Sequence, residues 1–399
     1  MTDRSRACLL FAALTTACGQ EGPETSSGAA SAVVRDSAGV RIVENAQASR
    51  VGWRAGPSPL FTLGWAPDDP SFAWLQSGRI MTDGGAVVGD AGAATLYRVG
   101  RDGSVVTTWG RRGEGPGEYQ RFDAILLLGD SILVSDARLR RVTVLSSEGE
   151  VLTTRRLPGA FLHQVSSILT DGRLLLIPGE GYSQIADTRP EWVFEAQPIL
   201  TADLESGAVD TVAELPHLRR WYGDRGASPG PVAVKGRAGG FAEGFAWARS
   251  DVPEVRWFDG SGRLVQIARW EEEPVPLTSQ WRDSLARSVE VAFRSRGASQ
   301  AVLTRRLAEL KDELDRHDGP LPFWSSFHVD GRGDAWLSEY PPPMQFPGRW
   351  RVITRDGTFV GWIDLPGVIA ILDVTNDRIL VVRRNDLDVP ALVMLELFK

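Results

Sequence analysis

The sequence predicts an all-β fold built from six similar units, and three observations lead to that prediction. Alternating apolar runs end repeatedly at Asp-Gly or Glu-Gly turns, as in LYRVGRDGSVVTTW, a pattern typical of β-hairpins. A second series of turns precedes the hairpins, near residues 84, 129, 172, 238, 331 and 377. Most of these turns are spaced by about 45 residues, enough for four short strands. Together these observations predict a six-bladed β-propeller with four-stranded antiparallel blades.

A glycine-rich segment lies between the first two units. Residues 110–117 (GRRGEGPG) contain four glycines in eight positions and precede another strand pattern, DAILLLGDSILVSD. A phosphate-binding loop is normally followed by a helix whose N-terminus faces the anion. In addition, Glu114 and Glu118 would repel a phosphate. We therefore interpret the segment as the connection from the outer strand of one blade to the inner strand of the next, where glycine permits sharp turns.

The last unit lacks a strand, which indicates how the ring closes. Residues 368–398 supply three strand patterns, and PLFTLGW at 59–65 has the pattern of an outer strand. We expect residues near 59–64 to complete the sixth blade. GVRIVEN at 39–45 predicts a further strand at the same seam.

Two helical segments interrupt the strand pattern between the fourth and fifth units. Residues 278–294 and 300–316 each place apolar side chains on one helical face, and Gly297 separates them. We expect a helical insertion over residues 277–318. The sequence leaves open whether it acts as a lid over the central channel or as a lateral brace.

The N-terminus has the features of an export signal. Arg4 and Arg6 precede a short apolar run that ends in small residues before Cys18, which resembles a bacterial lipoprotein processing site. This resemblance implies removal of residues 1–17 and lipidation of Cys18. A cleaved signal with a chance cysteine is the alternative. Residues 18–38 are polar and read as a flexible tether, which leaves residues 39–399 as the folded domain.

Composition excludes several classes of function. The formal net charge is −7, which argues against nucleic acid as a partner. The only other cysteine, Cys8, lies within the signal, so the mature domain has no cysteine for a disulfide or a thiolate metal site. We expect a monomer that meets the membrane only through its lipid anchor.

The run GRRGEGPGEY, followed by an inner strand, resembles NHL-type repeats. With the lipoprotein leader, the chain is similar to the six-bladed β-propeller lipoproteins of Gram-negative bacteria over residues 39–398. The resemblance implies a protein anchored at the outer membrane, in the periplasm or exposed at the surface. It does not imply an activity, because one propeller fold hosts many chemistries.

Enzymatic propellers supply the alternative hypothesis. Calcium-dependent lactonases of this architecture resemble one another in using Glu, Asn and Asp from inner strands. This chain has only three asparagines, and none is clearly placed at an inner strand. A second class that such a propeller resembles is the peptide-amidating lyases, whose zinc site is built by histidines from separate blades. Here His163 and His328 lie near predicted inner strands and are the candidate pair, at different expected heights in the channel. This alternative is a Ca- or Zn-dependent hydrolase or lyase.

Binding is the function that the sequence favours. Fourteen tryptophans and two long loops, at 219–231 and 339–350, predict an aromatic, arginine-lined rim. The candidate ligand-binding residues are Trp221, Tyr222, Trp324, His328, Tyr340 and Trp350. We expect no catalytic residues and no cofactor. The partner would be an envelope protein or a small molecule such as a carbohydrate.

Overall fold

The computed structural model describes residues 32–46, 52–159, 163–179, 191–223 and 226–399. The expected signal at 1–17, the lipidation site Cys18 and most of the tether lie outside the described residues. Strands dominate the described chain, and they form six sheets that contain antiparallel ladders of at least four strands.

The first three sheets follow the chain in order. The first consists of β4 (Leu75–Ile80), β5 (Ala86–Asp90), β6 (Thr95–Val99) and β7 (Val105–Trp109). The second consists of β8 (Phe122–Leu128), β9 (Ser131–Asp136), β10 (Arg141–Leu145) and β11 (Val151–Arg156). The third has five strands: β12 (His163–Ile168), β13 (Leu174–Pro178), β14 (Glu191–Ala202), β15 (Val209–Gly223) and β16 (Gly226–Ser228).

The other three sheets include the N-terminal strands. The fourth joins β1 (Val33–Ser37) and β2 (Val40–Asn45) to β17 (Gly236–Phe241), β18 (Gly244–Arg249), β19 (Glu254–Asp259) and β20 (Leu264–Trp270). The fifth consists of β21 (Phe327–Val329), β22 (Ala335–Ser338), β23 (Arg349–Ile353) and β24 (Phe359–Asp364). The sixth consists of β25 (Val368–Val374), β26 (Arg378–Arg384), β27 (Pro390–Phe398) and β3 (Arg54–Leu63).

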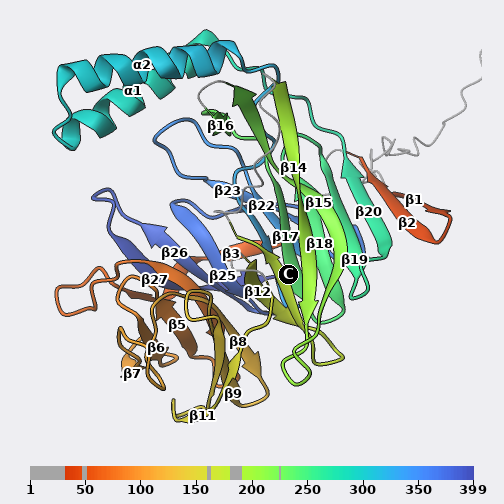
Figure 1. The fold of residues 1–399 in the computed structure, drawn as a ribbon, viewed down its shortest axis with the longest axis vertical. Helices are drawn as coiled ribbons and strands as arrows, with labels where there is room; N and C mark the ends of the chain where they lie inside the picture. Colours follow the sequence, from red (N-terminus) through yellow and green to blue (C-terminus); the bar gives the residue numbers. More distant parts are fainter. Residues whose placement is uncertain (1–31, 47–51, 160–162, 180–190, 224–225) are drawn as a thin grey trace, which may run out of the picture.

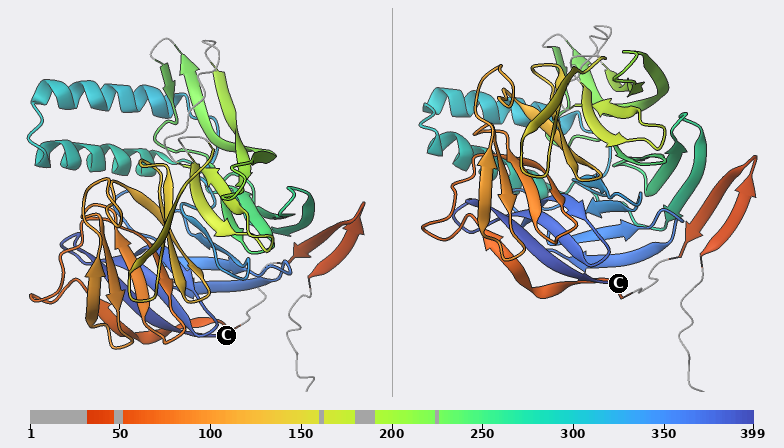
Figure 2. Two further views of the ribbon diagram at one scale, coloured as in Figure 1. Left: turned by 60° about the horizontal axis from the view of Figure 1, so that its bottom comes forward. Right: turned by 90° about the horizontal axis from the view of Figure 1, so that it is seen from below.

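Apolar cores lie between successive sheets. Clusters of buried side chains join the first sheet to the second, the second to the third, and so on to the fifth and sixth. A further cluster joins the sixth sheet back to the first, with Leu372 and Met394 packed near Val88 and Val99. Figure 1 and Figure 2 show these sheets around a common centre, as the expected all-β propeller requires.

In the second sheet burial falls toward the outer strand, as expected for sheets packed face to face. Five of the six residues of β9 are buried, whereas all six residues of β11 are exposed. Apolar sequence such as SILVSD therefore marks a strand between two neighbours, and polar sequence such as VLTTRR marks the outer one.

Tight turns occur at the predicted Asp-Gly positions, with one displacement. Gly103 has φ of +85°, and a Cβ there would lie 2.6 Å from Cβ of Phe61, so this turn needs glycine. The turn expected near residue 238 lies instead at 242–243, because β17 continues to Phe241. Gly239 and Gly240 belong to the strand.

The N-terminal strands close the fold in two places. The predicted outer strand of the last sheet is confirmed, because β3 pairs with β27 through Leu63↔Leu392 and neighbouring residues. The strand at 39–45 was expected at this seam, but β2 pairs in parallel with β20 of the fourth sheet. The reason lies in Asn45, whose side chain donates to the carbonyls of Arg269 and Gly357 and accepts from the amide of Phe359.

Two helices lie between β20 and β21. α1 (Ser279–Ser295) begins where the Thr278 side chain accepts from the amide of Trp281, and α2 (Gln300–Asp315) begins where Ser299 caps the amide of Val302. Gly297, with φ of +72°, makes the turn between them. Figure 1 shows the two helices side by side, projecting from one end of the molecule.

We predict that Asn45→Asp strongly destabilises the fold. The substitution places a carboxylate oxygen against two carbonyl oxygens, in a position that is only 5% exposed. An unsatisfied buried group of this kind costs about 2–4 kcal/mol. Thermal unfolding measures the effect, with Asn385→Asp as the control, because the Asn385 side chain acts only as an acceptor. An equal loss in both variants would contradict this role of Asn45.

Candidate functional site

The inner strands of the sheets run in the same direction, so their first residues share one end of the molecule, here called the top face. Side-chain bonds between neighbouring inner strands set this alignment: Ser77 of β4 accepts from the amide of Ile125 in β8. Asp123 of β8 accepts from Val165 in β12. The midpoints of successive inner strands therefore meet at similar heights.

The longest insertions gather on the top face. A small apolar core joins Val232, which precedes β17, to Leu310 and Leu314 of α2, with Trp281 of α1 and Tyr340 packed against it. The third sheet contributes the long pair β14 and β15, whose register extends from Ala202↔Val209 to Glu191↔Tyr222 at this end.

Two of the predicted rim aromatics hold the helical insertion. Trp221 packs against Trp192, with ring centroids 5.7 Å apart, and the Arg316 guanidinium lies 5.7 Å from the Trp221 ring. The indole N–H of Trp192 donates to the carbonyl of Arg316 at 3.0 Å. Tyr340 stacks on Trp281 of α1 with centroids 6.3 Å apart. These rings form a socket for the helices.

An ion pair completes this socket. Both terminal nitrogens of Arg219 donate to the Asp318 carboxylate at 2.8 Å, while its guanidinium lies 5.2 Å from the Trp192 ring. Bidentate pairs of this geometry are stronger than single contacts. The segment after α2 is therefore fixed to β15.

Two other predicted ligand-binding residues belong to the core. Trp324 is 0% exposed and packs on Phe327, and Trp350 is 1% exposed among side chains of the fifth and sixth sheets. Their role as surface stacking residues is therefore wrong in this structure. Both are needed to fill the space between sheets, which the sequence pattern alone does not show.

Tyr222 takes part in a buried polar cluster that lies beside the top face. Its hydroxyl donates to Glu195, which is 4% exposed, and Nε of Arg220 lies 3.1 Å from the same carboxylate. The cluster continues to His217 and Arg237, where the guanidinium donates to Nε2 of the imidazole at 3.3 Å. Burial, followed by the charges of Arg237 and Arg220, lowers the pKa of His217 to about 3.

The two candidate zinc ligands have different surroundings. His163 begins β12, and its Nε2 donates to the Pro198 carbonyl at 2.9 Å. His328 lies on β21, where burial first and then the charge of Arg79 lower its pKa to about 3. Within the described ranges, no group of three or more His, Cys, Asp or Glu side chains is arranged to hold a metal ion.

The channel wall is lined with polar groups that join neighbouring sheets. Arg79 of β4 donates to the Leu372 carbonyl of β25, and Asp373 accepts from the amide of Ile80. Burial raises the pKa of Asp123 to about 7, although Ser135 and two backbone amides donate to its carboxylate. These groups are engaged within the fold.

The glycine-rich loop hydrogen-bonds to the carboxylate of its own residue Glu118. The amides of Glu114 and Gly115 donate to Glu118 at 3.0 and 2.8 Å, and Arg111 pairs with the same side chain. Arg141 donates to the carbonyls of Glu114 and Gly115. The loop thus leads into β8 as a compact turn whose anion-binding groups are already used.

The sequence analysis does not identify Asn45, Glu195 or His217 as organising residues. For Glu195 and His217 the available signal is an ionisable residue within a strand pattern, whereas Asn45 belongs to no motif.

Comparisons with known proteins reveal a likeness of fold. A scan of protein-family models and a search of curated proteins found no match. A candidate exported protein from Bacteroides fragilis is 13% identical over 90% of this chain and 100% of its own, with a TM-score of 0.50. A member of the DUF4221 family from Bacteroides vulgatus is 10% identical over 88% of this chain and 99% of its own, with a TM-score of 0.51.

These similarities define a propeller-type β protein and go no further than the fold. In the described part of the chain, no helix is long and apolar enough to cross a membrane.

We predict that His217 makes the fold acid-sensitive. Its pKa is about 3 in the folded protein against about 6.5 when unfolded, so its stabilising contribution is present above pH 6.5 and lost as the pH falls toward 3. Between pH 7 and pH 5, this residue accounts for a loss of about 2 kcal/mol. His217→Gln, which keeps an acceptor for Arg237, should flatten the dependence of the melting temperature on pH in this range.

The control is His317→Gln, which changes a partly exposed histidine at the end of α2. An unchanged pH dependence in His217→Gln would contradict the assignment.

Proposed function

We propose that this protein is a lipid-anchored, six-bladed propeller that binds or scaffolds a partner at the cell envelope without catalysis. In this proposal the six sheets are the blades, β3 closes the ring, and residues 277–318 are an insertion between blades four and five. Residues 1–17 form the signal and the segment after them the tether, which is shorter than the expected 18–38, because β1 (Val33–Ser37) pairs with β2 and already belongs to the folded domain.

The top face is the proposed binding surface. The observation that carries this proposal is the gathering of α1, α2, β14 and β15 at one end, where ion pairs and aromatic contacts fasten them together. A preorganised surface loses less conformational entropy on binding than mobile loops do. The partner is an envelope protein or a small molecule, including a carbohydrate.

Photo-crosslinking in cells tests the choice of face. A photoreactive amino acid replaces Arg305, whose side chain is 74% exposed on α2, or Glu205 in the turn between β14 and β15 at the opposite end. We expect a discrete adduct from position 305 and none from position 205, resolved by electrophoresis and mass spectrometry. Equal labelling at both positions would overturn the choice of face, and labelling at neither would exclude a protein partner on the top face.

Metal analysis distinguishes the enzymatic alternative. One tightly held Ca²⁺ or Zn²⁺ per chain, together with metal-dependent turnover of a lactone, ester or peptide, would replace the binding proposal with a hydrolase or lyase.

The anchor is tested at Cys18. We expect Cys18→Ser to abolish incorporation of labelled fatty acid and to release the protein from the membrane fraction, because a thioether-linked lipid needs the cysteine sulfur. Cys8→Ser is the matched control within the expected signal. Continued lipid labelling of the Cys18→Ser protein would exclude this site of attachment.

A further inference from the structure

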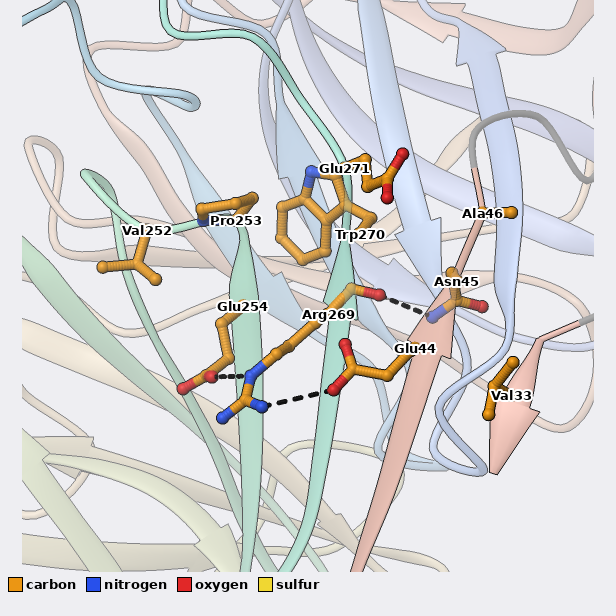
Figure 3. A pocket seen from close by; sticks show the side chains of 10 residues that line it. All are labelled: Val33, Glu44, Asn45, Ala46, Val252, Pro253, Glu254, Arg269, Trp270 and Glu271. Carbon is orange, nitrogen blue, oxygen red and sulfur yellow. Dashed lines mark hydrogen bonds and ion pairs between the residues drawn. The ribbon is translucent and has the colours of Figure 1, made fainter. Parts of the chain in front are cut away.

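A pocket at the edge of the fourth sheet is lined by none of the residues that hold the helices on the top face. It has a volume of about 340 Å³ and lies where β1 and β2 meet the ends of β19 and β20. Figure 3 shows its lining, which combines Glu44, Glu254, Arg269 and Glu271 with the apolar side chains of Val33, Val252, Pro253 and Trp270. The N-terminal strands β1 and β2 therefore complete a pocket that β17–β20 alone would not have.

A chain of ion pairs forms one wall. Nε of Arg269 donates to Glu254 at 2.5 Å, and its Nη1 lies 3.3 Å from Glu44 (Figure 3). Each of the two glutamates also has a second arginine partner, Arg256 or Arg35. These carboxylates are thus compensated, and they fix the shape of the wall.

Trp270 lies behind the apolar wall, where it is 6% exposed and reaches the pocket only with its edge. Its indole N–H donates to Glu272 at 2.8 Å, which fixes the ring plane. The Arg351 guanidinium lies 4.6 Å from the ring centroid, so this ring already interacts with one cation from within the fold. The half-buried side chains of Val252 and Pro253 provide most of the accessible apolar wall beside it.

Glu271 is the uncompensated charge of the pocket. It lines the pocket, is exposed, and has no ion pair or hydrogen bond within the described part of the chain. The lining therefore has three carboxylates against one guanidinium, and the free carboxylate follows Trp270 directly in the chain. An apolar wall next to a free carboxylate complements a cationic group carried on an apolar stem.

We propose that this pocket binds an arginine or lysine side chain of a partner polypeptide. The alkyl stem would pack against Val252, Pro253 and the exposed edge of Trp270, and the cationic head would pair with Glu271. The proposal rests on the cavity, its apolar wall and the unpaired charge together, and it does not use the contacts that hold the helices on the top face.

Isothermal titration of the full-length protein tests the inference. The probe is Nα-acetyl-arginine amide, and the comparison is Nα-acetyl-citrulline amide, which has a similar shape without the charge. We expect millimolar affinity for the arginine probe and binding about fivefold weaker for citrulline, since an exposed contact of this kind contributes about 1 kcal/mol.

Glu271→Gln should weaken the arginine probe about threefold to tenfold. The matched control is Glu273→Gln, an exposed glutamate two residues away that does not line the pocket. Both variants should keep the melting temperature of the parent protein. Three results would overturn the proposal: equal binding of the two probes, equal effects of the two variants, or no detectable binding at a probe concentration 50 times the expected Kd of about 1 mM.

Discussion

The backbone edge that each inner strand turns toward the channel needs hydrogen-bond partners, and neighbouring sheets supply several of them. Amides of Ile80, Ile125, Val165 and Gly240 donate to side chains of the preceding inner strand, namely Asp373, Ser77, Asp123 and Ser166. An unsatisfied buried amide costs about 1–3 kcal/mol, so each bond opposes a shift of one sheet against the next. Apolar burial between sheets supplies more free energy, but it is non-directional. The polar bonds set the height and angle at which the sheets meet, and hence the position of every loop on the top face.

Ring closure depends on one short N-terminal region that reaches three sheets. β2 extends the fourth sheet, Asn45 bonds to Gly357 and Phe359 of the fifth, and β3 completes the sixth. Trp53 adds a ring contact to Trp336 of the fifth sheet at 6.3 Å. Some of these contacts join residues separated by more than 300 positions, so they form against a large loop-closure entropy. Their many simultaneous bonds offset that cost together, which makes the N-terminal region part of the fold and also the wall of the pocket in Figure 3.

Local chemistry made most of the fold predictable, whereas distant packing decided the parts that were not. Asp-Gly turns and alternating strands depend on neighbouring residues, and a missing fourth strand can be found by counting. The partner of β2 could not be found in this way, because it depends on carbonyls more than 200 residues away. Gly239 and Gly240 read as a turn, yet they are needed because a Cβ at either position would lie within 2.6 Å of Val329 or Ser167. Trp324 and Trp350 were predicted as rim residues because the sequence shows their aromatic character but not their burial, which arises only when the sheets assemble. The lining of the pocket likewise joins β1, β2, β19 and β20, which no local motif connects.

The socket beneath the helices bears on whether the insertion is a lid or a brace. A lid must leave its position at a modest free-energy cost. Here departure would break the bidentate pair of Arg219 and Asp318, separate Trp281 from Tyr340, and expose Leu310 and Leu314, which are 2% and 4% exposed. Exposing a leucine side chain alone costs about 1.5–3 kcal/mol. Opening would therefore require a ligand with several kcal/mol of preference for the open state. The contacts favour a brace, and the same aromatic and arginine residues that suggest ligand stacking in the sequence hold a fixed extension of the top face.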